Sequence, residues 1–100
     1  MSQYTVYIKP DTFQEIKNIP GNMRQRVRRA IGDLADNPRP SNSKMLDLPN
    51  FEAELWRIRL DDWRIVYAIA EADRIVDVLA VRKRPPYNYE DLETLLEDLE

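Results

Sequence analysis

The chain of 100 residues carries 15 basic and 18 acidic side chains, a formal net charge of −3, and contains neither cysteine nor histidine. These absences exclude a disulfide framework, a thiolate metal site, a thiol nucleophile and the most common general base. No apolar run approaches the ~18 residues of a membrane helix, and no signal-peptide pattern precedes the first strand pattern, so we expect one cytoplasmic domain over residues 1–100.

The first part of the chain predicts a strand followed by two helices. Residues 4–9 alternate in the manner of a β-strand. Thr12 and Glu15 have the spacing of a capping box, which predicts a helix that begins at Thr12 and stops before residue 20. Asn22 is placed to cap a second, longer helix, whose apolar residues recur at helical spacing. We expect the two helices to form a hairpin laid on a sheet.

The middle of the chain predicts a loop and then a β-hairpin. Residues 39–50 are rich in proline, serine and asparagine, with a short strand near residues 44–46. Residues 55–67 alternate on both sides of Asp61-Asp62. A two-residue turn and a four-residue loop at this point give the same register.

The hairpin places arginines on one face. Period two puts Arg57 and Arg59 on the same side of the first strand, and Arg64 on that side of the second, across from Arg59. Like charges directly opposite each other destabilise a sheet. The arrangement therefore indicates a ligand, and guanidinium groups match phosphate oxygens in a bidentate fork.

The last part of the chain predicts a strand and an acidic helix. Over residues 74–81 the alternation puts Val76, Val78 and Ala80 on one face, and a proline pair then stops the strand. Residues 87–100 contain six acids and no base, which leaves 15 basic and 12 acidic residues in positions 1–86. Residues 86–100 are expected to form a helix that frays and is mobile, because acids at its far end oppose the helix dipole.

These elements predict an α+β domain. The expected order is β-α-α-β-β-β-α, in which an antiparallel sheet carries the N-terminal helical hairpin on one face and ends in a C-terminal helix.

The candidate functional residues are the basic side chains that these strands bring to one concave face, together with two tyrosines just after them. Arginines stabilise the extra negative charge of a pentacovalent phosphate, and a tyrosine can transfer a proton or stack on a base. No acidic group has the spacing of a metal site, so neither metal nor cofactor is expected. The alternative is that the arginines are simply solvated and the tyrosine packs on the last helix. The candidates are Lys44, Arg57, Arg59, Arg64, Arg82, Lys83, Arg84, Tyr87 and Tyr89.

The chain resembles the RelE/ParE-type toxins of bacterial type II toxin–antitoxin systems over nearly its whole length. Residues 55–67 are similar to the family pattern "lwRiRvgdyRivY", residues 78–84 to "vlxvgxR", and residues 36–46 to the "NPrp…kL" loop. The resemblance implies the compact α+β toxin fold. It also implies RelE-like cleavage of mRNA in the ribosomal A site, without a metal, by attack of the 2′-hydroxyl on the adjacent phosphate.

The resemblance also implies residue roles. Arg57 and Arg59 match two basic family positions, Arg64 and Arg84 match the arginines around the scissile phosphate, and Tyr87 or Tyr89 fills the tyrosine position. The assigned catalytic residues are Arg57, Arg64, Arg84, Tyr87 and Tyr89, and the assigned RNA-binding residues are Lys44, Arg59, Arg82 and Lys83.

The implied partners are a cognate antitoxin whose tail wraps the toxin, mRNA on the ribosome, and operator DNA only through the antitoxin complex. No membrane partner is expected. ParE-like members share the fold but poison DNA gyrase and lack the catalytic set. A gyrase inhibitor, or a module that only binds an antitoxin, is therefore the alternative, and the retained arginines and tyrosine favour the RelE-like function.

Overall fold

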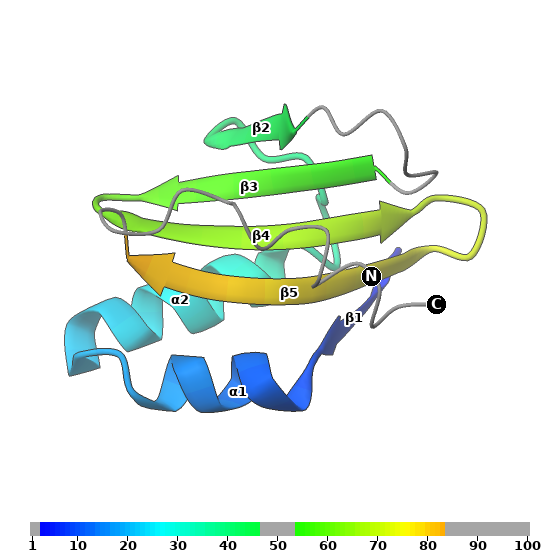
Figure 1. Ribbon diagram of the computed structural model, residues 1–100. Helices are drawn as coiled ribbons and strands as arrows, with labels where there is room; N and C mark the ends of the chain where they lie inside the picture. The colour runs from blue at the N-terminus through cyan, green and yellow to red at the C-terminus, as the bar shows by residue number, and fades with distance from the viewer. Residues whose placement is uncertain (1–2, 47–53, 84–100) are drawn as a thin grey trace.

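The computed structural model describes residues 3–46 and 54–83. Two helices lie on one face of a twisted five-stranded sheet (Figure 1). The predicted α+β class is confirmed, while the C-terminal helix expected for residues 86–100 lies outside the described residues. The elements in chain order are β1 (Thr5–Ile8), α1 (Pro10–Lys17), α2 (Gly21–Asp33), β2 (Ser43–Leu46), β3 (Glu54–Leu60), β4 (Trp63–Ala70) and β5 (Ile75–Lys83).

The sheet has the strand order β1-β5-β4-β3-β2. Strands β2 to β5 pair antiparallel, as predicted. Strand β1 is the exception, because it pairs parallel with β5. A parallel pair needs a long connection that returns the chain to the same end of the sheet, and here the connection comprises both helices and three strands. Alternation within one strand does not reveal the direction of its partner.

The core lies between the helices and the sheet. Apolar side chains of both predicted helices are buried against one face of the sheet. Phe13 of α1 is the exception among the described residues, because it is 49% exposed. The apolar set predicted for the hairpin faces them, so the predicted parity of β3 and β4 is confirmed. Burial of each large side chain contributes roughly 1.5–3 kcal/mol. The buried residues of this core are Tyr4, Ile16, Ile19, Val27, Ile31, Leu34, Ile58, Ile65, Tyr67, Ile69, Val76, Val78 and Val81.

Both predicted helix caps were wrong. Helix α1 begins at Pro10, and its N-cap makes no side-chain hydrogen bond. Proline suits this place because its fixed φ is helical and its missing N–H is not needed there. Helix α2 begins at Gly21 and its N-cap likewise lacks a side-chain bond, so Asn22 lies inside the helix. Burial of the apolar faces stabilises both helices without these caps. Within the described residues, no helix has the length and apolar composition needed to span a membrane.

Strand β5 contains a β-bulge at Leu79. Tyr67 pairs with Val78, whereas its neighbour Val66 pairs with Ala80, so Leu79 has no residue opposite it. A bulge adds one residue to one strand and turns the following side chains over.

The bulge decides which face Arg82 occupies. Val76 and Val78 belong to the core beneath the helices, but Ala80 does not. The predicted parity, with Ala80 on the face of the two valines, was therefore wrong, because the extra residue leaves no mark in the alternation. After the bulge, Arg82 pairs with Arg64 on the face away from the helices.

Candidate functional site

The hairpin of β3 and β4 has the predicted register. Arg59 pairs with Arg64, and Arg57 pairs with Val66. The strands are joined by a two-residue turn in which Asp61 has a φ of 52°. Aspartate tolerates this left-handed conformation better than most residues.

Four arginines gather on the sheet face away from the helices. Arg59, Arg64 and Arg82 occupy paired positions on three neighbouring strands, which lie about 4.8 Å apart in a sheet. Arg57 lies on the same face, two residues before Arg59 on β3. We call Arg57, Arg59, Arg64 and Arg82 the arginine cluster.

The other predicted site residues are distributed unevenly. Lys44 of β2 pairs with Arg57 and is exposed, so it lies beside the cluster. Lys83 pairs with Trp63, which packs against the core, so its side chain starts from the opposite face. Arg84, Tyr87 and Tyr89 lie outside the described residues and stay predictions. Over residues 3–46 and 54–83, no group of three or more acids is arranged to hold a metal ion.

Arg64 is the buried centre of the arginine cluster. Only 9% of the residue is exposed. Its Nη1 donates hydrogen bonds to the carbonyl oxygens of Asp61 (2.9 Å) and Trp63 (3.0 Å). Its buried Nε has no hydrogen-bond partner within residues 3–46 and 54–83. Arginine stays charged in proteins, and an unpaired buried donor is costly. A bound anion would supply the missing acceptor.

Glu15 brings a carboxylate to the edge of the cluster. The Nε of Arg82 donates to Oε2 of Glu15 at 2.8 Å. Both side chains are about one-third exposed, at 34% for Arg82 and 28% for Glu15. The spacing of Thr12 and Glu15 marked Glu15 only as part of a capping box, so its contact with Arg82 was not predicted.

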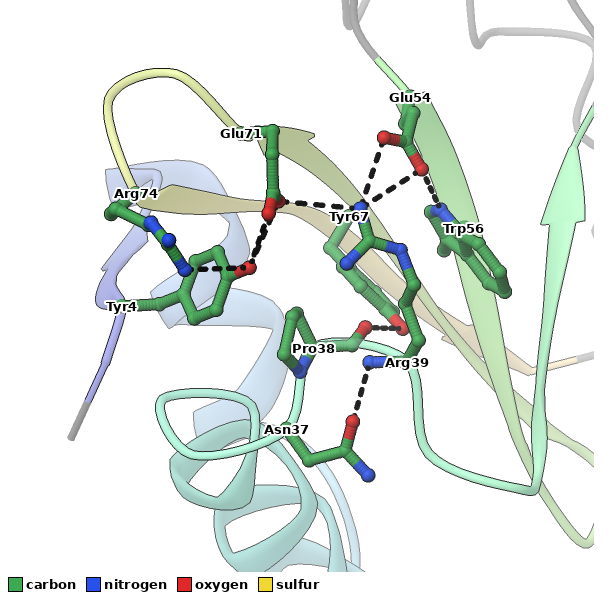
Figure 2. Close-up of polar contacts among 9 residues, drawn as sticks. All are labelled: Tyr4, Asn37, Pro38, Arg39, Glu54, Trp56, Tyr67, Glu71 and Arg74. Carbon is green, nitrogen blue, oxygen red and sulfur yellow. Dashed lines mark hydrogen bonds and ion pairs between the residues drawn. The ribbon is translucent and has the colours of Figure 1, made fainter. Parts of the chain in front are cut away.

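A second polar network lies at the opposite end of the sheet (Figure 2). Arg39 Nη2 donates to both carboxylate oxygens of Glu54, at 3.1 and 3.0 Å, and to Glu71 at 3.3 Å. Glu54 holds the pKa of Arg39 above its ordinary value, and the Tyr4 hydroxyl, which donates to Glu71 at 2.8 Å, lowers the pKa of Glu71. This network ties the loop after α2 to the sheet, and no pattern in the sequence predicted it.

Tyr67 anchors the same loop from inside the core. Its hydroxyl donates to the Pro38 carbonyl oxygen at 2.7 Å, and its side chain is fully buried. Burial raises the pKa of Tyr67 from 10.0 to about 12.

Alkaline unfolding will test this burial. The pKa of Tyr67 is higher in the folded chain than in the unfolded chain. The protonated side chain therefore contributes up to roughly 3 kcal/mol to the free energy of unfolding below pH 10, and this contribution is lost as the pH rises toward 12. We expect the urea midpoint of the wild type to fall more steeply over this range than that of Tyr67→Phe. At pH 7 the substitution is expected to cost about 1–3 kcal/mol, because the Pro38 carbonyl loses its donor. Parallel pH profiles would contradict the assignment.

An apolar groove lies on the helix side of the molecule, between α1, α2 and β1. It has a volume of about 530 Å³, and its apolar lining includes Phe13, which is 49% exposed. Three cations, Lys17, Arg24 and Arg28, also line it, and Lys17 Nζ lies 5.0 Å from the Phe13 ring centroid. The groove suits an apolar surface that carries negative charge.

Comparison with known proteins identifies the family of this chain. Residues 6–85 match the family described as the ParE toxin of the type II toxin–antitoxin system parDE. No curated protein is similar enough in sequence to match. The match confirms the resemblance stated from the sequence.

Solved structures of RelE toxins share the fold. A chain of the archaeal RelE–RelB complex from Pyrococcus horikoshii OT3 is 22% identical with a TM-score of 0.74, covering 85% of this chain and 99% of that one. A mutant E. coli RelE toxin in the free state is 17% identical with a TM-score of 0.71, covering all of both chains. A chain of the RelBE2 toxin–antitoxin complex from Mycobacterium tuberculosis is 24% identical with a TM-score of 0.66, covering 82% of this chain and 99% of that one. The family match extends over most of the chain, and the protein therefore belongs to the ParE toxin family of type II toxin–antitoxin systems, within the RelE/ParE superfamily.

Proposed function

We propose that this toxin is a RelE-like, ribosome-dependent mRNA endonuclease. The observation that carries the proposal is the row of Arg59, Arg64 and Arg82 on three neighbouring strands. The buried Nε of the central arginine has no acceptor among the described residues. A row of like charges costs stability in the free protein. A phosphodiester would offset that cost and satisfy the open donor.

The chemistry proposed for this face needs no metal. The 2′-hydroxyl oxygen attacks the adjacent phosphorus and loses its proton to a base, while the bond to the 5′-oxygen breaks and that oxygen takes up a proton. The products are a 2′,3′-cyclic phosphate end and a 5′-hydroxyl end. Preorganised arginines stabilise the additional negative charge of the transition state.

We assign the roles as follows. Arg64 and Arg84 surround the scissile phosphate, Arg57 is a further catalytic cation, and Tyr87 or Tyr89 transfers the proton or stacks on a base. Lys44, Arg59 and Arg82 contact flanking phosphates. Lys83 is the weakest of the assigned RNA contacts, because its strand position faces away from the arginine cluster.

The second candidate is a ParE-like inhibitor of DNA gyrase. The matching family is described as the ParE toxin, which favours this candidate. The solved relatives named above are RelE proteins, and the paired arginines favour an RNA target. The two candidates differ in what they damage, so one experiment separates them.

We further propose that the apolar groove receives the antitoxin. Solved relatives include several complexes of RelE with RelB. The apolar lining and the three cations fit an amphipathic helix with acids along its margin. A toxin that acts on ribosomes would work in the cytoplasm and contact operator DNA only through its antitoxin complex.

Primer extension on a reporter mRNA in a reconstituted translation reaction tests the enzyme proposal. We expect discrete cuts that require both the toxin and ribosomes. Intact mRNA together with loss of gyrase supercoiling would establish the second candidate instead. Absence of both effects would leave only antitoxin binding and would overturn the enzyme proposal.

A further inference from the structure

Within residues 3–46 and 54–83, no strand pairs with the edge of β5 beyond the point where β1 ends. The pairing of β1 with β5 stops at Val78, and helix α1 lies alongside β5. Thr12 Oγ1 donates to the carbonyl oxygen of the bulged Leu79 at 2.7 Å, and the Val81 N–H donates to Glu15 Oε1 at 3.4 Å. Two side chains one helical turn apart thus satisfy backbone groups that a neighbouring strand would otherwise take.

The same carboxylate holds the side chain of Arg82. Its Oε2 accepts a hydrogen bond from Arg82 Nε at 2.8 Å, in a partly exposed ion pair. An acceptor on Nε restricts the plane of the guanidinium, because its five donors form a rigid fork. Arg82 reaches this face only because of the bulge, and Thr12 binds the bulged residue.

We propose that Glu15 is a positioning residue that orients the Arg82 guanidinium beside Arg64 for contact with an RNA phosphate. The assignment deepens the proposed ribonuclease function and rests on it. Glu15 itself does not touch the RNA, and acts through Arg82. The Thr12-x-x-Glu15 pattern then serves the functional face rather than the start of its own helix.

A double-mutant cycle on the cleavage rate tests the proposal. Glu15→Gln keeps the shape of the side chain and removes its charge. At saturating ribosomes we expect it to slow cleavage on the order of tenfold in the wild-type background and to have no further effect in the Arg82→Ala background. A loss of folded protein would instead lower the rate in both backgrounds. Asp11→Asn is the matched control, because it removes one exposed acid from the same helix.

Side-chain order supplies a readout that needs no ribosome. In the nitrogen-labelled toxin, refolded after removal of its antitoxin, the Arg82 Nε–H heteronuclear NOE is expected to be high. It should fall in Glu15→Gln and stay unchanged in Asp11→Asn. An unchanged value in Glu15→Gln, or equal slowing of cleavage in both backgrounds, would overturn the proposal.

The two readouts separate this inference from the function on which it rests. If the wild-type toxin cleaves no mRNA, the ribonuclease proposal and the RNA role of Arg82 both fail. A fall of the Arg82 signal in Glu15→Gln would still support the ion pair as a contact that orders this side chain.

Discussion

Replacing Arg64 with alanine is expected to reduce ribosome-dependent cleavage by roughly 100- to 1,000-fold, the usual effect of removing one preorganised donor from a developing oxyanion. Arg64 is the central and most buried member of the arginine cluster, and its Nε has no acceptor in the part of the chain that the structure describes. The measurement is the single-turnover rate of primer-extension cuts at saturating ribosomes.

The fold should survive this substitution. Alanine removes a buried cation from between two like charges, which offsets the two carbonyl hydrogen bonds that are lost. We therefore expect a melting temperature close to that of the wild type. Arg64→Lys keeps the charge without the fork and should recover little activity.

Arg29→Ala is the matched control for Arg64→Ala. It removes the same charge from an exposed position of α2, on the helix side of the molecule, and should leave the rate unchanged. If Arg64→Ala cleaves as fast as Arg29→Ala, the arginine cluster is not the site of RNA cleavage.

The register of the arginines was predictable because it depends on local rules alone. Period two fixes the faces of β3 and β4, and the Asp61-Asp62 turn fixes which residues pair. The pairing of Arg59 with Arg64 follows from those two facts, without knowledge of the rest of the chain.

Arg82 was expected beside the other basic residues, but the alternation of β5 alone does not predict its face. Its face depends on the bulge at Leu79, and the alternation of β5 carries no signal of an extra residue. The bulged carbonyl is bound by Thr12, which lies 67 residues away in the sequence. A single sequence contains no regular pattern that reveals a contact between residues so far apart.

The Thr12-x-x-Glu15 pattern shows how tertiary contacts override a local signal. In an isolated helix these two side chains would bind its first amides. Here Pro10 already occupies the first turn of α1. Strand β5 offers the Leu79 carbonyl oxygen to Thr12 and the Arg82 guanidinium to Glu15. The network around Arg39 is similar, since Tyr4 and Glu71 meet across 67 residues.

The groove and the arginine cluster lie on opposite faces of the sheet, which predicts that antitoxin binding and toxicity can be separated. Phe13→Ala is expected to weaken antitoxin binding on the order of 10- to 100-fold, the effect of losing an aromatic anchor. Its cleavage rate should not change, because Phe13 lines the groove on the other side of the sheet from the arginine cluster.

Met45→Ala is the matched control for the groove. Met45 is as exposed as Phe13, at 53% against 49%, but it lies on β2 and outside the groove. Calorimetric titration with the purified antitoxin should show weaker binding for Phe13→Ala alone. In cells, an antitoxin level that neutralises the wild type should then fail to neutralise Phe13→Ala.

Equal losses of affinity in both variants would place the antitoxin elsewhere. Loss of cleavage in Phe13→Ala would show that the two faces are coupled through α1, the helix that carries both Phe13 and Glu15.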